Sequence, residues 1–288
     1  MISLVICTRN RATALGRCLD HVARIVDDGA WQIVLVDNGS SDNTADVIAR
    51  FAATPGLAVV AVSQPVRGLS NARNAGVAAA VGDILLFTDD DCYVAPDILD
   101  AVRTTFTDPK IGYATGRVRL FDPADAAVTV NESAVPLRFE PRQFLPAGTV
   151  KGANLAFRRL VLDQIAEHGV AFDPRFGSGA RWPAEDADAA QRAALAGWAG
   201  VYAPDIVVHH HHGRKLGDLA ALHRDYDLGR GAFHAKLLTR RGGLLPGLKA
   251  WVGLPRRALH RRSLLADELR GAFGYWFSAS GADARGEH

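Results

Sequence analysis

Hydrophobic positions in the first 110 residues follow two alternating patterns. Short, continuous apolar runs predict buried strands, and each is followed by a segment with apolar residues at helical spacing. The predicted strands are Ile2–Cys7, Trp31–Val36, Leu57–Val62 and Ile84–Thr88, and the predicted helices are Ala12–Val26, Thr44–Phe51, Leu69–Ala80 and Pro96–Phe106. In the first helix the expected apolar face is Leu15, Leu19, Val22 and Val26. This alternation predicts an α/β fold with a mostly parallel sheet covered by helices on both faces.

The pattern is less regular in the second half of the chain. Prolines interrupt residues 111–150, where we expect strands and a loop over a cleft. Regular spacing then returns, with strands expected at Asn154–Arg159 and within Val201–Val208, and helices at Leu160–Glu167 and Glu185–Ala196. Helical patterns dominate from Leu216 to the end. We therefore expect an α/β domain over residues 1–212 and a helical C-terminal extension over residues 213–288.

Composition excludes several classes of protein. A chain of 288 residues that is 48% hydrophobic can bury a large core. With 22% charged residues and a net charge of +2, it fits neither a disordered protein nor a general nucleic-acid binder. Three cysteines without C-x-x-C spacing form neither a disulfide framework nor a zinc site, and they fit a reducing compartment. The chain has no recognisable signal peptide and no apolar run of membrane-spanning length, so we expect a cytoplasmic protein.

The small net charge conceals an asymmetry between the two parts of the chain. Residues 1–212 carry 19 Lys and Arg against 24 Asp and Glu, whereas residues 213–288 carry 14 against 7. Seven basic residues of the extension are interleaved with leucines and aromatic residues: Arg240, Arg241, Lys249, Arg256, Arg257, Arg261 and Arg262. Such segments can lie on an anionic membrane surface, here the inner face of the cell membrane. They can also pack against the α/β domain or against a second subunit, with their arginines in solvent. The sequence leaves peripheral membrane contact and a homodimer open.

Polar segments follow three of the predicted strands. They are Thr8-Arg9-Asn10, Asp37-Asn38 and Asp89-Asp90-Asp91. Because ligands of such sheets bind beyond the carboxyl ends of the strands, we expect all three segments to face one cleft. No G-x-G-x-x-G follows a strand and no G-x-x-x-x-G-K-[ST] occurs, which excludes the usual dinucleotide fingerprint and a P-loop.

The three adjacent acids indicate a cation. They repel one another unless a cation or donors compensate them. In an extended chain Asp89 and Asp91 point the same way, which suits Mg²⁺ or Mn²⁺ shared with a substrate diphosphate. A solvated acidic turn is the alternative. Four consecutive histidines, 209–212, follow the last predicted strand, and one or two of them could reach a metal.

Two further segments carry candidate chemistry. Gly68 permits a tight turn, and Arg73 lies on the first turns of the helix that follows, a combination suited to a diphosphate. Glu185 and Asp186 open another helix. The helix dipole accounts for one of these acids, and the other could be a general base.

Taken together and in this order, these motifs resemble the family 2 glycosyltransferases, inverting enzymes of the GT-A (Rossmann-like) fold. The resemblance covers roughly residues 1–212, with a nucleotide-binding half at 1–110 and an acceptor-binding half at 111–212. It is carried by Val5–Asn10, Val34–Thr44, Gly68–Asp83, Phe87–Asp91, Lys151–Arg159, Glu185-Asp186 and Pro204–His212. Cys7 stands where the family usually has proline.

The resemblance also implies roles for individual residues. Donor-binding residues would be Thr8, Arg9, Asn10, Asp37, Gly68, Arg73, Asp89 and Asp90. Asp91 would bind the metal together with a histidine, most naturally His210, with His209 and His212 left open. Asp186 would be the catalytic base, and Trp182, Glu185 and Asn154 would lie on the acceptor side.

The implied reaction moves a sugar from a nucleotide-diphosphate donor, a UDP-sugar being favoured, to a hydroxyl of a saccharide, lipid-linked or other acceptor in glycoconjugate synthesis. It would use Mn²⁺ or Mg²⁺. A sugar-nucleotide nucleotidyltransferase is an alternative, but it would usually carry a Gly-rich loop where this chain has Cys7-Thr8-Arg9-Asn10-Arg11. A non-catalytic scaffold would have lost Asp91 or Asp186, and both are present.

Overall fold

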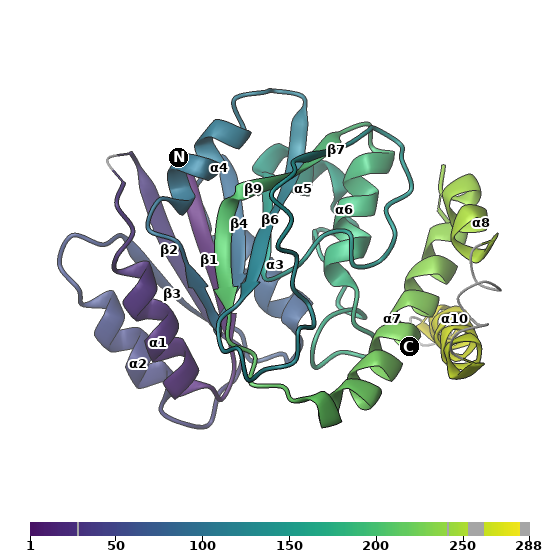
Figure 1. The fold of residues 1–288 in the computed structure, drawn as a ribbon, viewed down its shortest axis with the longest axis horizontal. Coiled ribbons are helices and arrows are strands. Elements are labelled where there is room, and N and C mark those ends of the chain that lie inside the picture. The colour runs from purple at the N-terminus through teal and green to yellow at the C-terminus, as the bar shows by residue number, and fades with distance from the viewer. Residues whose placement is uncertain (28, 241, 253–261, 283–288) are drawn as a thin grey trace, which may run out of the picture.

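The fold is built on a nine-stranded mixed sheet (Figure 1). The computed structural model describes residues 1–27, 29–240, 242–252 and 262–282. The strands are β1 (Ile2–Thr8), β2 (Trp31–Asp37), β3 (Val59–Ser63), β4 (Ile84–Asp89), β5 (Cys92–Val94), β6 (Ile111–Leu120), β7 (Leu137–Phe139), β8 (Asn154–Arg158) and β9 (Ala199–His210). Their order is β3-β2-β1-β4-β8-β6-β9-β5, with β7 also paired to β9.

Parallel pairing in the first half aligns the carboxyl ends of the strands. β1 pairs in parallel with both β2 and β4, and the register sets Thr8 opposite Asp37 and Cys7 opposite Asp89. In the second half, β8 runs antiparallel to β4 and β6, and β9 runs parallel to β6. The antiparallel pair of β5 and β9 then brings Cys92 opposite His210. The predicted polar segments therefore meet at one edge of the sheet.

Helices cover both faces of the sheet, as the alternation of strands and helices predicts. α1 (Ala12–Val22), α2 (Thr44–Ala52) and α4 (Ile98–Thr105) pack on one face. α3 (Leu69–Ala79), α5 (Arg159–Ile165) and α6 (Glu185–Leu195) pack on the other. Alternate strand residues divide between the two cores: Leu4 and Ile6 enter the first, and Val5 enters the second. This alternation explains why the strands are apolar throughout.

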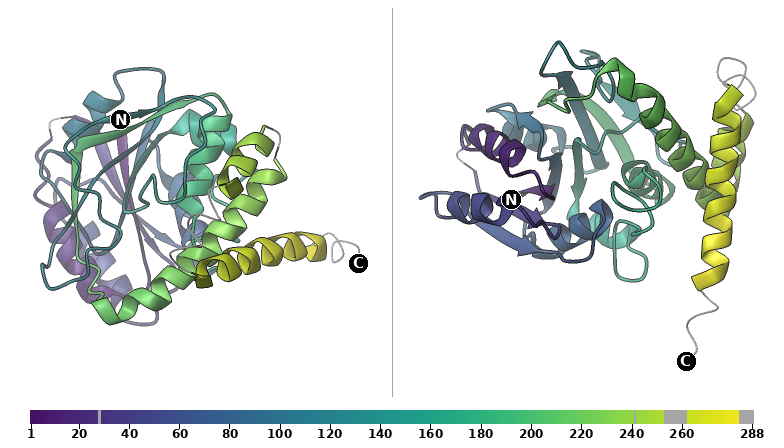
Figure 2. Two further views of the ribbon diagram at one scale, coloured as in Figure 1. Left: turned by 45° about the vertical axis from the view of Figure 1, so that its right-hand side comes forward. Right: turned by 90° about the horizontal axis from the view of Figure 1, so that it is seen from below.

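The C-terminal helices form a third core with the rest of the chain. After a short 3₁₀ turn at Leu216–Asp218, α7 (Leu219–Leu238) lies beside α6, and α8 (Leu244–Val252) and α10 (Arg262–Ala282) pack on α7 (Figures 1 and 2). Phe233 of α7 and Tyr275 of α10 share a buried cluster with Phe176 and Trp182. The two long helices cross closely, since a Cβ at Gly231 would overlap the backbone of Glu268. The extension is therefore packed against the α/β part.

The expected fold class is confirmed, and each predicted strand is present with its ends shifted by at most a few residues. The first helix is shorter than predicted: it ends at Val22, and Val26 is 74% exposed rather than part of the apolar face. Residues 111–150 contain strands as expected, the long β6 and the short β7. Arg241, Arg256, Arg257 and Arg261 of the basic set lie outside the described residues.

No helix in the described part of the chain is both long enough and apolar enough to cross a membrane.

Candidate active site

A cavity of about 990 Å³ lies at the carboxyl ends of the strands. Its lining includes the loop after β1, the end of β4, the first turns of α3 and α6, the end of β9 and residues of α7, together with the loops at 147–153 and 177–184. Predicted site residues on its wall are Thr8, Arg9, Asn10, Gly68, Arg73, Asp89, Asp90, Asp91, Glu185, Asp186 and His210. Segments from all over the sequence thus meet around one space.

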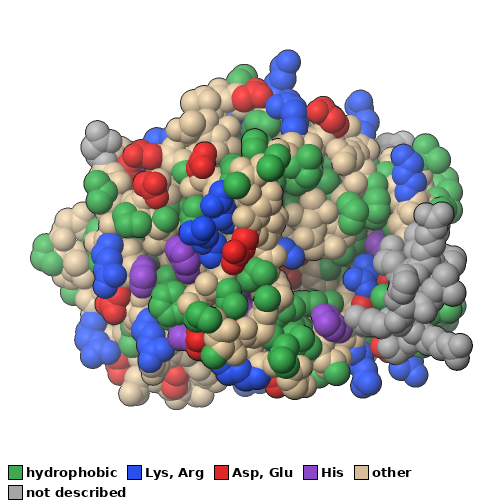
Figure 3. Space-filling view, in the orientation of Figure 1, with side chains coloured by type: hydrophobic (Ala, Val, Ile, Leu, Met, Phe, Trp, Pro, Cys, Tyr) green, Lys and Arg blue, Asp and Glu red, His purple; other side chains and the backbone are tan. Residues whose placement is uncertain are grey.

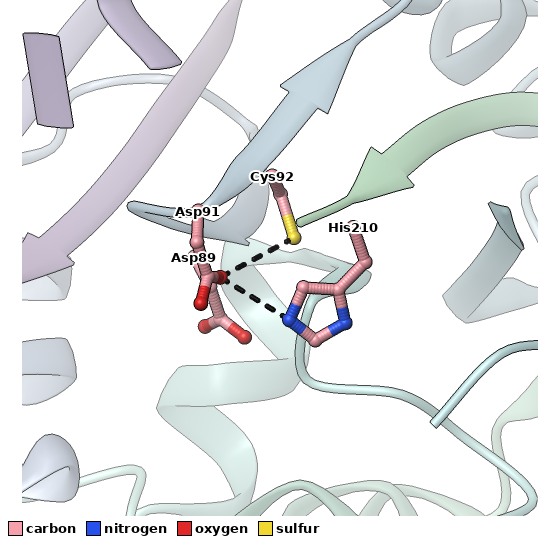
Figure 4. Close-up of side chains that lie close together, drawn as sticks. All are labelled: Asp89, Asp91, Cys92 and His210. Carbon is pink, nitrogen blue, oxygen red and sulfur yellow. Dashed lines mark hydrogen bonds and ion pairs between the residues drawn. The ribbon is translucent and has the colours of Figure 1, made fainter. Parts of the chain in front are cut away.

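Four side chains, from β4, the turn after it, β5 and β9, could hold a metal ion. One ligand atom each from Asp89, Asp91, Cys92 and His210 lies within 4.8 Å of the others (Figure 4). His210 Nε2 is 3.2 Å from Asp91 Oδ1. The pairing of β5 with β9 produces this proximity, because it sets Cys92 opposite His210.

The chemistry of three of these donors suits Mn²⁺ or Mg²⁺. Burial alone would raise the pKa of Asp91, but the hydrogen bond and charge of His210 and the charge of Arg11 hold it below its ordinary value. Burial raises the pKa of the Cys92 thiol well above its usual range, so the sulfur stays protonated and is a poor ligand. Two carboxylates and an imidazole leave coordination positions free for the oxygens of a diphosphate.

Arg11 is a cation in contact with the acidic cluster that sequence analysis did not single out. Its Nε lies 2.9 Å from Asp90 Oδ1 and its Nη2 lies 2.7 Å from Asp91 Oδ2. Thr8 Oγ1 donates to Asp90 Oδ2 at 2.6 Å. Burial nevertheless raises the pKa of Asp90 to about 7, against the charge of Arg11 and the hydrogen bond of Thr8. The position of Arg11, directly after the polar loop of β1, is the signal that could have found it.

The consecutive histidines point to different places. His210 joins Asp91, whereas the His211 ring shares a hydrogen bond with the Tyr93 hydroxyl at 2.9 Å. His211 also lies near Asp122 and Asp125, but Asp125 already has a cation, since Lys215 Nζ is 2.6 Å away. Of the four histidines, only His210 lines the cavity.

Arg73 ties the acidic edge of the sheet to the start of α6. Its Nη1 is 2.9 Å from Glu185 Oε1, and its Nη2 donates to the Gly152 carbonyl at 3.1 Å and lies 3.6 Å from Asp89 Oδ1. Burial raises the pKa of Glu185, and the charge of Arg73 opposes that rise. Because both side chains are buried, this ion pair fixes the relative positions of α3 and α6.

Asp186 lies on the cavity wall in the first turn of α6. Its Oδ2 accepts a hydrogen bond from the Gly152 N–H at 2.9 Å. Ala184, the residue directly before Glu185 and Asp186, has φ 118°. A positive φ of this size is strained for a residue other than glycine. The strained turn and the Gly152 contact hold Asp186 at the cavity.

The loop residues predicted to bind the donor make hydrogen bonds that stabilise the loops after β1 and β2. Asn10, with φ 53°, accepts from the Ser41 N–H at 2.7 Å, and Arg9 Nε donates to the Gly39 carbonyl at 3.4 Å. Asp37 accepts from the Ser40 N–H at 2.9 Å and does not line the cavity. Its neighbour Asn38 lines the cavity, and Asn38 Oδ1 accepts a hydrogen bond from the Gly68 N–H at 2.9 Å. Gly68 itself has φ 122°.

Two residues expected on the acceptor side do not reach the cavity lining. Asn154 is buried at the start of β8, and its Nδ2 donates to the carbonyls of Arg117 and Ile206. It joins strands of the sheet. Trp182 is 4% exposed and packs against Phe176 and Tyr275, because α10 covers it.

Further lining residues were not predicted. Among them are Arg214 and, on α7, His223, Tyr226 and Arg230. Burial raises the pKa of the Tyr226 hydroxyl, Arg214 lowers it, and the charge of Asp186 adds to the rise. Positions 223, 226 and 230 share one face of a helix, so their polar spacing is a signal that sequence analysis could have used.

The family model for glycosyl transferase family 2 matches residues 3–165. This chain belongs to glycosyltransferase family 2. The glycosyltransferase is 24% identical over 240 residues to glycosyltransferase AglE of Haloferax volcanii, a match that covers 83% of this chain and 75% of AglE. It is 40% identical over 97 residues to a PGL/p-HBAD biosynthesis glycosyltransferase of Mycobacterium bovis, covering 33% of this chain and 38% of that protein.

Solved structures share the GT-A fold of this glycosyltransferase. The mannosyltransferase PcManGT of Pyrobaculum calidifontis, in complex with GDP-Man and Mn²⁺, matches with a TM-score of 0.66 and 22% identity, over 100% of this chain and 76% of PcManGT. S. aureus TarS 1–349 in complex with UDP-GlcNAc matches with a TM-score of 0.61 and 15% identity, over 83% of this chain and 66% of TarS 1–349.

Proposed function

We propose that this glycosyltransferase is an inverting, metal-dependent enzyme that transfers a sugar from a nucleotide-diphosphate donor, preferentially a UDP-sugar, to an acceptor hydroxyl. Asp186 is the single general base. The observation that carries this proposal is that Asp186 lines the same cavity as Asp89, Asp91 and His210. A general base and a cation-binding cluster on one cavity are what a one-step displacement requires.

On the donor side, the residues hold and neutralise the leaving group. Asp91 and His210, with Asp89 beside them, would hold the divalent cation. When bound, the cation stabilises the negative charge that develops on a nucleoside diphosphate leaving group. Thr8, Arg9, Asn10, Asp90, Gly68 and Arg73 would bind the nucleotide, with Asn38 taking a place on the cavity wall that we expected for Asp37.

On the acceptor side, Asp186 takes the proton of the attacking hydroxyl. The Gly152 N–H donates to its Oδ2 and the Ala187 N–H donates to its Oδ1, which fixes the carboxylate at the cavity wall. The hydroxyl oxygen attacks the anomeric carbon from the face opposite the diphosphate, and the C–O bond to the phosphate breaks. With one base and no nucleophilic carboxylate, the configuration at the anomeric carbon inverts. Glu185 positions Asp186 by anchoring α6 to Arg73.

The names of the structural neighbours support a nucleotide-sugar donor. PcManGT is described with GDP-Man and TarS with UDP-GlcNAc, so both bases belong in a donor screen. The acceptor, a saccharide, lipid-linked or other hydroxyl compound, would enter between α6 and the polar face of α7, where Tyr226 and His223 line the cavity. The division into a catalytic part at 1–212 and an extension at 213–288 stays a prediction, and α7 contributes to the cavity from beyond that boundary.

The test is Asp186→Asn with UDP- and GDP-sugars and an acceptor library. We expect transfer to fall about 10²–10⁴-fold, the usual contribution of a general base, while donor binding in a calorimeter is retained. The product anomer, assigned by NMR, should be inverted. Transfer near the wild-type rate would remove Asp186 as the base, and retention of configuration would overturn the one-step mechanism.

Asp91→Ala tests the metal site separately. We expect it to weaken Mn²⁺ binding and Mn²⁺-dependent donor binding, both measured without turnover. Asp205→Ala, an exposed acid on β9, is the matched control. Mn²⁺ affinity unchanged by Asp91→Ala would contradict the assignment of the cation to this cluster.

A further inference from the structure

We propose that the outward faces of α8 and α10 form a docking surface for an anionic lipid membrane. The two helices lie on the side of α7 that points away from the sheet (Figures 1 and 2). We call their exposed apolar side chains, together with Lys249 and Arg270, the docking face. The apolar members are Leu244, Leu245, Leu248 and Val252 of α8 and Leu265, Leu269, Phe273, Trp276 and Phe277 of α10.

The docking face is a regular helical stripe. On α10 the exposed residues recur at intervals of three or four, which places them on one side of the helix. Phe277 is 75% exposed and Phe273 is 51% exposed. The opposite side of α10 is buried: Ala272 and Tyr275 pack in the cluster shared with α7. An apolar stripe of this size left open on a folded protein indicates an interaction surface.

The positive charge around the docking face favours an anionic partner. Residues 240–278 contain eight Lys and Arg but only two acids, Asp267 and Glu268. Both acids are buried, and Glu268 is ion-paired with Arg230 of α7. Among the side chains of this segment whose burial the structure describes, the exposed ionisable ones are the cations Lys249 and Arg270. Arg270 has 74% of its side chain exposed, and its Nη1 lies 3.3 Å from the buried Asp267 carboxylate. Apolar residues flanked by cations are typical of interfacial helices on anionic lipid.

A second copy of the chain fits the docking face less well. An interface between two copies that is formed by the same surface on each would bring like charges together, which opposes association. Anionic lipid headgroups complement the cations, and the acyl region accepts the leucine and phenylalanine side chains. The charge of the face therefore favours lipid.

The helix that carries most of the docking face, α10, also contacts residues at the cavity. Arg230 lines the cavity and pairs with Glu268 on α10, and Gly274 of α10 packs against Trp182 beside the α6 N-terminus. A membrane bound at α8 and α10 would thus lie next to the acceptor side of the site. This consequence, an acceptor presented at the lipid surface, rests on the proposed function, whereas the docking surface itself does not.

The experiment is vesicle flotation of the full chain without donor or acceptor. One set of vesicles contains phosphatidylcholine with phosphatidylglycerol, and the other contains phosphatidylcholine alone. We expect binding to the anionic vesicles, about tenfold or more weaker binding to the neutral ones, and weakening by added salt. Phe273→Ser with Phe277→Ser should reduce binding about tenfold, because two large apolar side chains are lost from the interface.

Matched controls separate the docking face from general surface effects. Lys249→Glu with Arg270→Glu should reduce binding at least tenfold, and Arg24→Glu with Arg50→Glu, exposed cations on or just after α1 and α2, should have little effect. Val135→Ser with Leu160→Ser, which are 71% and 51% exposed, is the apolar control. Equal reductions by test and control variants would overturn the proposal.

Two other outcomes would also overturn it. Equal binding to both kinds of vesicle would remove the charge argument. Absence of vesicle binding, together with a dimer in solution that Phe273→Ser and Phe277→Ser dissociate, would assign the face to a second copy. Flotation involves no turnover, so a failed donor assay and a failed flotation assay report on different proposals.

Discussion

At the scale of single residues, the side chain of Arg11 would compete with a divalent cation for the carboxylates of the acidic cluster. Arg11 contacts Asp91 Oδ2 at 2.7 Å, while His210 approaches Oδ1 at 3.2 Å. The Arg11 side chain is 43% exposed, so it can leave the cluster at modest cost. A divalent ion that binds Asp91 would have to displace it. Arg11 thus keeps adjacent carboxylates compensated until the ion binds.

Arg11→Ala is therefore expected to strengthen Mn²⁺ binding. A partly exposed ion pair contributes about 0.2–1 kcal/mol, so the dissociation constant for Mn²⁺ without donor should fall by up to about fivefold. Electron paramagnetic resonance of free Mn²⁺ measures this directly. Arg9→Ala removes a neighbouring cation that bonds the Gly39 carbonyl and serves as control. Weaker Mn²⁺ binding in Arg11→Ala would show instead that Arg11 supports the site.

Residues at strand ends were the easiest to predict from the sequence. Asp89, Asp91 and Asp186 follow an apolar strand or open a helix, and local rules place them at the cavity. Trp182 illustrates the limit. The family resemblance placed it on the acceptor side, but Tyr275, far along the chain, packs against it and helps bury it. Tyr226 was missed for the same reason: its place depends on how α7 packs.

At the scale of elements, a buried charge network joins the C-terminal helices to the α/β part. Lys236 of α7 lies 2.7 Å from Asp173 and 2.8 Å from Asp188 of α6. Arg175 binds Asp173 at 2.7 Å and donates to the Tyr275 hydroxyl of α10 at 2.8 Å. Since Lys236 is 1% exposed, loss of its partners would leave a buried charge uncompensated. The network fixes α7 and α10 on α6.

This network predicts a dependence of stability on pH. Burial would raise the pKa of Asp173, but Arg175 and Lys236 lower it far below its ordinary value. The folded state therefore binds fewer protons than the unfolded state, whose Asp pKa is about 3.9. The contribution of Asp173 is present in full above that pKa and is lost as the pH falls below it.

Asp173→Asn should accordingly reduce the free energy of unfolding at pH 7, and its difference from wild type should shrink as the pH drops below about 4. Urea unfolding at a series of pH values measures this. Asp205→Asn, at an exposed position, should follow the wild-type profile. A difference that stayed constant down to pH 2.5 would rule out the ionised carboxylate of Asp173 as its source.

Element boundaries show which sequence signals were sufficient. The end of α1 was misplaced because Val26 continued the apolar spacing, yet the chain turns at Ala23 and Val26 stays exposed. The order of β8, β6 and β9 in the sheet has no local signal, since it depends on pairing between distant segments. Hydrophobic periodicity predicted where the strands of the first half lie. It could not predict the order of the strands in the second half of the chain.

At the scale of the whole molecule, net charge is a poor description of the surface. On the face drawn in Figure 3, acidic and basic side chains are interspersed and neither sign forms a continuous field. The asymmetry found in the sequence instead has two structural counterparts. Acids gather at the cavity, at Asp89, Asp90, Asp91 and Glu185, and cations are left exposed on α8 and α10 because the two acids of that region are buried.

The extension is also part of the folded core, which gives a prediction for truncation after Gly213. Removing α7, α8 and α10 would uncover Phe176 and Trp182, now 0% and 4% exposed, and would delete the α7 wall of the cavity. We expect residues 1–213 to aggregate or to unfold at a markedly lower temperature, since a large apolar patch becomes solvent-exposed. Size-exclusion chromatography and thermal unfolding would measure this. A monomeric fragment with wild-type stability and donor-dependent transfer would show instead that the extension is an independent appendage.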